Sequence, residues 1–173
     1  MERPKDKLAQ KEHYSGKKKD HMIKNYLMIG QDCRIMFLSP TVPATIADIE
    51  LARQSDLNLK EGCCAMQDCG FQGFEFSDTK NDVEILQPKK KPRGKSLTPF
   101  EKIVNRIISS SRVYIEHVIG STKRWECVHE ICRLRVEGIQ DMLMEICCGL
   151  HNFKVRCMPW AEIPMPGELR KSV

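Results

Sequence analysis

The chain has 173 residues, of which 41% are hydrophobic and 29% charged, a composition that excludes wholesale disorder. Its length suits one domain with a core of its own. The formal net charge is +5, and the longest run without a charged residue, 35–47, contains two prolines and is too short to cross a bilayer, so we expect no membrane partner.

The first predicted elements are two strands joined by a short turn. Residues 20–29 and 33–39 are mostly apolar and are separated by Gly-Gln-Asp, a pattern typical of a β-hairpin. Two prolines then interrupt the chain, and the apolar spacing within 45–55 predicts a short helix whose isoleucine and leucine side chains face inward.

The next two predicted strands are short. Residues 62–67 are an apolar run that ends at Asp68, just before the turn Gly-Phe-Gln-Gly. Such a run is typical of a buried strand that delivers an acid to the edge of a sheet. Residues 83–87 predict another strand, which Pro88 ends. The mixture of strands and helices predicts an α/β fold.

A long helix is predicted from Pro99 onward. Thr98 and Glu101 have the spacing of a capping box, and proline is favoured at the first helical position. Apolar residues recur at helical spacing as far as Ile119, and Gly120 is expected to end or kink the helix.

A second apolar stripe predicts a C-terminal helix. The stripe consists of Ile139, Met142, Leu143, Ile146, Cys147, Leu150 and Phe153. Three prolines mark residues 158–173, which we expect to be a disordered tail after a domain at 1–157.

A second acid stands out on the long predicted helix. Glu116 would share one helix face with Arg112 and Lys123. Gly120 would leave open space one turn beyond the acid. From the spacing alone, an Arg112–Glu116 surface ion pair without a function is the favoured interpretation, and a chemical role stays open.

Two basic runs suit a polyanion such as nucleic acid, and a merely solvated surface is an equal interpretation of the runs taken alone. Aromatic residues are 6% of the chain, too few for a base-stacking platform, so Trp125 and Trp160 are expected to be packing residues. The first run, 1–24, holds eight Lys or Arg residues and the second, 89–95, holds five. The residues expected to contact a polyanion are Lys17, Lys18, Lys19, Lys89, Lys90, Lys91 and Arg93.

The nine cysteines point to a reducing compartment, because the polar N-terminus predicts no secretory signal. We therefore expect thiols and a cytoplasmic location. A zinc site could be drawn from Cys127, His129 and Cys132, but this spacing matches no paired Cys-x-x-Cys motif and we do not favour it.

A series of motifs occurs in order along residues 2–155. They are Arg-Pro-Lys-Asp-Lys (3–7), Tyr-Ser-Gly-Lys-Lys-Lys (14–19), Ile-Met-Phe-Leu-Ser-Pro (35–40), Asp-Cys-Gly-Phe-Gln-Gly (68–73), Pro-Lys-Lys-Lys-Pro-Arg-Gly-Lys (88–95), Glu-His-Val-Ile-Gly (116–120), Lys-Arg (123–124) and Cys-Gly-Leu-His-Asn (148–152). Together they resemble the nuclease domain of bacterial insertion-sequence transposases of the DDE superfamily, in the branch related to Harbinger-type elements.

The resemblance implies a ribonuclease H-like fold, with a mixed central sheet flanked by helices. It also implies three carboxylates that hold two Mg²⁺ or Mn²⁺ ions, of which Asp68 is the second and Glu116 the third. The first acid lies upstream of the motif that here begins at Arg3, so we expect that acid and its strand to be missing. Lys123 and Arg124 would contact DNA phosphates, as would the two basic runs.

We therefore predict a fragment of a transposase nuclease domain that acts on double-stranded DNA at the bacterial nucleoid and has little catalysis of its own. A missing strand would expose a sheet edge, so a second copy or a complementing transposase subunit is an expected partner. The alternative is a basic DNA-binding module without catalysis, whose DNA binding would respond to salt but not to EDTA.

Overall fold

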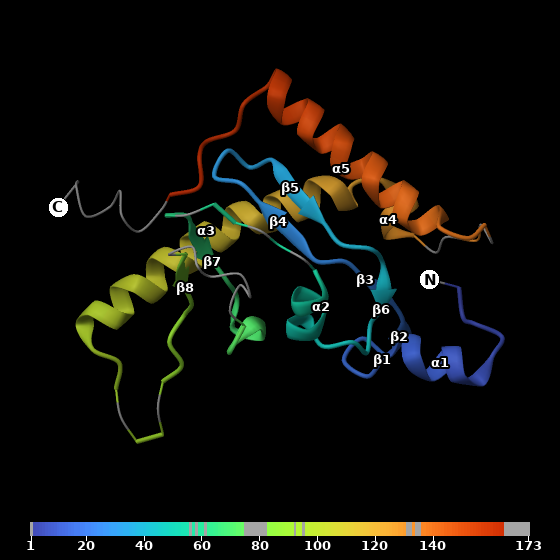
Figure 1. Cartoon of the computed structure of the whole chain (residues 1–173), viewed down its shortest axis with the longest axis horizontal. Coiled ribbons are helices and arrows are strands. Elements are labelled where there is room, and N and C mark those ends of the chain that lie inside the picture. The colour runs from blue at the N-terminus through green and yellow to red at the C-terminus, as the bar shows by residue number, and fades with distance from the viewer. Residues whose placement is uncertain are drawn as a thin grey trace. The chain divides into compact units, whose positions relative to one another are not determined.

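The computed structural model describes residues 2–55, 57, 59–60, 62–74, 83–91, 93–94, 96–130, 133 and 136–164 (Figure 1). The chain forms two compact units, each described here by itself. The first unit comprises residues 1–47 and 115–162, and the second comprises 48–114 and 163–173. Helix α3 (Pro99–Lys123) contributes its N-terminal part to the second unit and its C-terminal part to the first.

The strands of the first unit form three separate antiparallel pairs, after the short helix α1 (Lys7–His13). β1 pairs with β2, β3 with β6, and β4 with β5. The bounds are β1 (Tyr14–Ser15), β2 (Asp20–His21), β3 (Ile23–Lys24), β4 (Leu27–Ile29), β5 (Ile35–Leu38) and β6 (Val42–Pro43).

The β4–β5 pair is the predicted hairpin. The backbone N–H of Gly30 donates to the Arg34 carbonyl oxygen at 2.8 Å across its turn, and Cys33 has a left-handed φ of 62°. The hairpin is confirmed, but the single strand predicted over 20–29 is wrong. That segment is divided among β2, β3 and β4 because its residues pair with three different partners.

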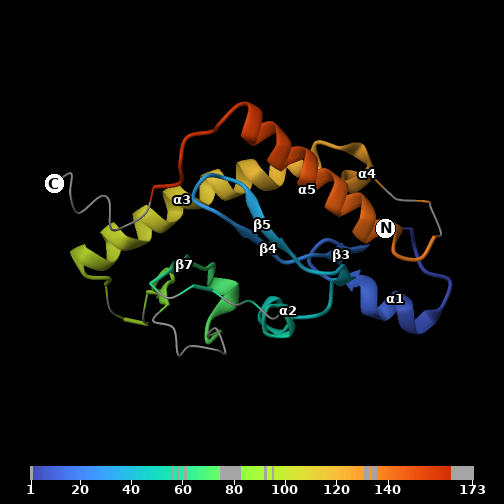
Figure 2. The ribbon, with the colours of Figure 1, turned by 45° about the horizontal axis from the view of Figure 1, so that its top comes forward.

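Two helices of the first unit follow α3, namely α4 (Glu126–His129) and α5 (Ile139–Cys157). Figure 2 shows α5 beside the β4–β5 hairpin. The side chain of Asn152 bonds to both backbone groups of Ile35, at 2.8 and 2.9 Å. His151 is 2% exposed, and its Nε2 lies 2.9 Å from the Cys33 carbonyl oxygen. These bonds fix which side of α5 faces the hairpin.

The predicted C-terminal helix is confirmed, and most of its apolar stripe is not buried. Its exposed apolar stripe includes Phe153, which is 65% exposed. Apolar residues occur on several sides of this helix, and the hydrogen bonds of His151 and Asn152 select the side that packs. The buried residues are Met144, Cys147, Cys148, His151 and Val155, and the exposed stripe is Met142, Ile146, Leu150 and Phe153.

The second unit contains the parallel pair β7 (Cys64–Met66) and β8 (Glu84–Leu86), which confirms both predicted strands. β7 is half-buried rather than buried. Helix α2 (Asp48–Gln54) confirms the predicted short helix and buries Leu51. The 3₁₀ turn η1 (Cys69–Phe71) follows β7.

The predicted capping box at the start of α3 is confirmed. Glu101 N–H donates to the Thr98 hydroxyl at 3.2 Å, and Thr98 N–H donates to the Glu101 carboxylate at 2.9 Å. An end of the helix at Gly120 is wrong, because α3 continues to Lys123. A glycine inside a helix weakens it without stopping it when the flanking residues are good helix formers.

The mixed α/β class is confirmed. Among the described residues, every sheet has two strands. No helix in the described ranges is both long enough and apolar enough to span a membrane. Within the segment 158–173, Ile163 is buried and the Pro164 carbonyl oxygen accepts a hydrogen bond from Ser111 at 2.8 Å. Residues 165–173 lie outside the described part of the chain.

Candidate functional site

Asp68 is positioned by the parallel strand pair of the second unit. The backbone N–H of Gln67 donates to the Leu86 carbonyl oxygen at 3.0 Å, and the chain turns into η1 at the next residue. The Asp68 side chain is 48% exposed, and its Oδ1 lies 3.1 Å from an Nη of Arg112 on α3. The sequence predicted a buried strand that delivers an acid to the edge of a sheet. Asp68 follows β7 by two residues, and β7 is half-buried.

Arg112 forms an ion pair with Asp68, a partner that the sequence did not suggest, and the predicted Arg112–Glu116 pair stays a prediction. Helical spacing indicates which residues share a face, but it cannot reveal a partner from a segment far away in the sequence. A third acid, Asp48, lies close to the same turn. Its Oδ2 would be 3.4 Å from a Cβ atom built on Gly70.

Glu116 is exposed on the part of α3 that belongs to the first unit. It lines a hollow of about 450 Å³, and a Cβ added at Gly120 would meet nothing within 4 Å. The open space predicted one turn beyond the acid is therefore confirmed. The other lining residues are His117, Gly120, Ser121, Arg124 and Trp160.

The two acids belong to different compact units: Asp68 lies in the second and Glu116 in the first. Carboxylate oxygens are the ligands that Mg²⁺ and Mn²⁺ prefer, so both acids suit such an ion by their chemistry. Within the described ranges, however, no three His, Cys, Asp or Glu side chains gather as a metal-binding group. The two carboxylates are therefore the right kind of ligand for a divalent ion, but they are too few to form a complete metal site within the described ranges.

Two adjacent buried cysteines of α5, Cys147 and Cys148, have thiols whose acidity is suppressed. Burial raises the pKa of the Cys147 thiol to about 12 and that of Cys148 to about 11. Cys127 Sγ lies 3.7 Å from Cys147 Sγ. Thiols of this kind pack as small apolar groups, and Cys132 of the disfavoured zinc site lies outside the described residues.

The basic residues of the N-terminal run, Lys17, Lys18 and Lys19, are exposed in the turn between β1 and β2. In the second run, Lys89 Nζ lies 2.8 Å from a Glu101 carboxylate oxygen, and Lys90 Nζ donates to Gln72 at 2.9 Å. The remaining members of the predicted set are exposed, namely Lys91, Arg93, Lys123 and Arg124.

Glu101 has a strongly shifted acidity. The Lys89 ammonium, followed by the Thr98 N–H and hydroxyl of the capping box, lowers the pKa of its carboxyl to about 2. Lys89 is also fixed through its backbone, because Asn105 exchanges two hydrogen bonds with it, each of 2.9 Å. The second basic run is therefore tied to the first turns of α3.

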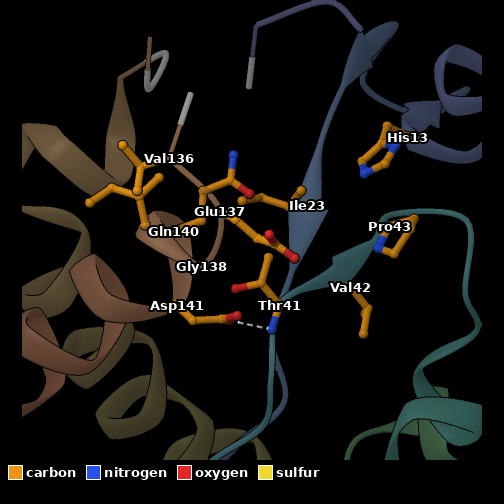
Figure 3. Close-up of a pocket in the computed structure, with 11 residues that line it drawn as sticks. His13, Ile23, Thr41, Val42, Pro43, Val136, Glu137, Gly138, Gln140 and Asp141 are labelled. Atoms are coloured by element: carbon orange, nitrogen blue, oxygen red, sulfur yellow. Dashed lines mark hydrogen bonds between the residues drawn. The ribbon is translucent and has the colours of Figure 1, made fainter. Parts of the chain in front are cut away.

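The first unit has another hollow, of about 240 Å³, at the start of α5 (Figure 3). Asp141 points to the backbone of Thr41 and accepts its N–H at 2.6 Å. His13 and Glu137 also line it. The Asp141 bond ties α5 to the segment before β6, which gives this acid a structural role.

A sequence model described as DDE superfamily endonuclease matches residues 1–152. The "Probable transposase for insertion sequence element IS702" of Microchaete diplosiphon is 33% identical over 157 residues, which cover 90% of this chain and 54% of that relative. The chain thus spans about half the length of the curated relative that it matches. No solved structure matches the chain. These matches confirm the family inferred from the ordered motifs, and the chain belongs to the DDE superfamily endonucleases.

Proposed function

We propose that the chain is part of the nuclease domain of a DNA transposase, built on a ribonuclease H-like plan, with Asp68 and Glu116 as two of its three metal-binding carboxylates. The observation that carries this proposal is the exposed Asp68 carboxylate directly after β7, within a chain whose residues 1–152 match the family. Glu116 supports it as an exposed acid on α3 beside a hollow.

A divalent ion held by these acids would activate the attacking water or hydroxyl and stabilise the leaving oxygen. The chain's own residues have other tasks in this proposal. Arg112 orients the Asp68 carboxylate, at 3.1 Å. Lys123 and Arg124 follow Glu116 by about two helical turns and present positive charge to the DNA backbone.

We expect the chain by itself to cut DNA little or not at all. Two carboxylates cannot bridge two metal ions and also complete the coordination shell of each ion. The described residues bring no third ligand to them. A complementing transposase subunit or a second copy would supply what is lacking. The nucleic acid partner would be double-stranded DNA in the bacterial nucleoid, held by its phosphates without sequence readout.

The test measures the effect of metal on DNA binding. Fluorescence anisotropy of a labelled duplex is compared in Mn²⁺ and in EDTA at constant ionic strength. Mn²⁺ should tighten binding by the wild-type chain, and Asp68→Asn and Glu116→Gln should each remove that increment. Glu126→Gln, which neutralises an exposed acid on α4, is the matched control and should respond to Mn²⁺ as the wild type does.

An unchanged response to Mn²⁺ in both variants would refute the assignment of the acids. The expected lack of DNA cleavage is tested separately, by measuring nicking of supercoiled plasmid in Mg²⁺ or Mn²⁺. Robust nicking that Glu116→Ala abolishes would show that the chain holds a complete centre.

A basic DNA-binding module without catalysis remains the second candidate, because Lys17, Lys18 and Lys19 are exposed together on one turn. DNA affinity that falls steeply with salt, but is identical in Mn²⁺ and EDTA, would favour this candidate. Replacing the three lysines with Gln should then reduce the salt dependence by about three counterions at most.

A further inference from the structure

Two cysteines that are 20 residues apart in the sequence meet where α4 lies against α5 (Figure 1). Cys127 Sγ on α4 lies 3.7 Å from Cys147 Sγ on α5, so the two thiols are within hydrogen-bonding distance. The sulfur atoms of a disulfide are about 2.05 Å apart. The gap to be closed is therefore about 1.7 Å, a movement that rotation of the two cysteine side chains can supply.

The other cysteines of α5 are poorly placed to replace either member of this pair. Cys148 follows Cys147 directly, and consecutive Cα atoms are about 3.8 Å apart, whereas Cα atoms joined by a disulfide are usually about 4.4–6.8 Å apart. Cys157 is the last residue of α5 and lies about 15 Å along the helix from Cys147. The geometry therefore favours Cys127 as the partner of Cys147.

The two thiols differ in their access to solvent. Cys127 is exposed, whereas Cys147 is 2% exposed. Burial, followed by the hydrogen bond and the charge of Cys127, raises the pKa of Cys147 to about 12. A dissolved oxidant therefore reaches Cys127 first, because reaction at sulfur requires an accessible thiolate. Oxidation of Cys127 would remove its charge, and with it one of the effects that suppress the ionisation of Cys147.

We propose that Cys127 and Cys147 form an oxidation site, at which a hydroperoxide converts the two thiols into a disulfide that joins α4 to α5. The Cys127 thiolate attacks the peroxide; an S–O bond forms, the O–O bond breaks, and the departing oxygen takes up the proton that the thiol had released. Cys147 Sγ then attacks Cys127 Sγ. The S–S bond forms as the S–O bond breaks, and the hydroxyl group leaves with the Cys147 proton as water. The electrons that the thiols lose reduce the peroxide to water or an alcohol.

The bond is reversible and restrains a short helix. Cys127 is the second residue of α4 (Glu126–His129), so a covalent bond at this position fastens the whole of α4 to α5. A dithiol reverses the bond by exchange. In a reducing compartment such disulfides are transient and respond to oxidants. The site does not involve the metal-binding acids, so it does not rest on the proposed function.

The experiment counts thiols before and after oxidation. The whole chain, fully reduced, is treated with equimolar hydrogen peroxide in EDTA, unfolded, alkylated with N-ethylmaleimide and weighed by mass spectrometry. The untreated chain should carry nine adducts, one for each cysteine, and the oxidised chain should carry two fewer. Dithiothreitol should restore the missing adducts, and the oxidised protein should run as a single chain on a non-reducing gel.

Single substitutions identify the pair. Tryptic peptides alone cannot do so, because Cys127 shares its peptide with Cys132, and Cys147 shares its peptide with Cys148. Cys127→Ser and Cys147→Ala should each keep all of their remaining thiols after oxidation. Cys132→Ser and Cys148→Ala should lose two adducts, as the wild type does. Cys157→Ser should also lose two, and it is the matched control for the loss of an exposed cysteine.

A trapping reagent tests the order of the two steps. In Cys147→Ala the sulfenic acid of Cys127 has no thiol to attack it, so dimedone should label Cys127 strongly. In the wild type the disulfide forms instead, and labelling should be weak. Because Cys127 is exposed, Cys127→Ser tests the pair without disturbing the core, even if Cys147→Ala does not fold.

Three results would overturn the proposal: nine adducts on the oxidised wild type, a disulfide that persists in Cys127→Ser or Cys147→Ala, or a disulfide that joins two chains on the gel. Loss of the disulfide in Cys132→Ser, Cys148→Ala or Cys157→Ser would assign it to a different pair and would also overturn the proposal. None of these measurements involves DNA or a metal ion. The disulfide can therefore fail to form while the proposed function holds, and the reverse is also true.

Discussion

Two polar clusters, one in each compact unit, differ in how far they are buried. In the first unit, Asn152 and the buried His151 bond to the backbone of the distant β4–β5 hairpin. In the second unit, the ion pairs join exposed or partly exposed side chains, Arg112 with Asp68 and Lys89 with Glu101. Breaking a buried bond leaves an unsatisfied group, whereas an exposed pair is worth about 0–1 kcal/mol.

This difference indicates where each perturbation should act. Substitutions at these contacts between α5 and the hairpin should cost more free energy than substitutions at these two ion pairs. Acid and salt should act mainly on the ion pairs, because those contacts depend on charge.

The largest effect is expected for His151→Ala. This change removes a buried ring that contacts Trp160 and leaves the Cys33 carbonyl oxygen without its partner, so it should lower the free energy of unfolding by about 3 kcal/mol. Urea denaturation measures it. Phe153→Ala, two residues further along on the exposed stripe, should cost under about 0.5 kcal/mol. Equal losses would show that α5 packs by a different face.

Thr98→Ala should have an intermediate effect. It removes the hydroxyl that accepts the Glu101 N–H, and loss of such a cap costs about 1 kcal/mol. Amide hydrogen exchange in the first turn of α3 should accelerate. Ser96→Ala, just outside the cap, should leave exchange unchanged, and acceleration in both variants would argue against the capping box.

Acid should loosen the same turn. The pKa of Glu101 is about 2 in the folded chain against an ordinary 4.5, so its ionised form contributes stability above about pH 4.5. That contribution should disappear as the pH falls from about 4.5 to about 2. Hydrogen exchange followed across this range measures it. Glu101→Gln should have no such step, and a step that persists in this variant would assign the effect to another acid.

The smallest effect is expected for Arg112→Ala. Its ion pair with Asp68 is about half exposed on both sides, so its loss should cost at most about 1 kcal/mol, and less in high salt. The measurement is the thermal unfolding midpoint of Arg112→Ala and of the wild type, each at low and at high salt. A loss that does not change with salt would mean that Arg112 acts by packing rather than by charge.

The features predicted best from the sequence are those that depend on residues close together along the chain. The β4–β5 hairpin follows from its turn residues, and the capping box of α3 follows from Thr98 and Glu101, whose contacts lie within three residues. The family was also predicted, because its motifs occur in a fixed order along most of the chain.

Contacts between distant segments could not be predicted in this way. The face of α5 depends on Asn152 reaching Ile35, and the ion pair of Arg112 with Asp68 joins α3 to the segment after β7. Trp160 was predicted to pack, and its ring does meet the buried His151; nothing near it in the sequence reveals that it also lines a hollow with α3. The sequence motifs identified the two acids of the candidate site, but they did not predict which residues surround each acid.

The exposed stripe of α5 has a consequence for handling the protein. A ridge of exposed apolar side chains runs along this helix, formed by Met142, Ile146, Leu150 and Phe153. Sulfate salts strengthen the burial of such surface, so ammonium sulfate should drive molecules together through this ridge. The same salt weakens attraction between lysines and phosphates. Raising its concentration should therefore release nucleic acid and promote clustering of the protein at once.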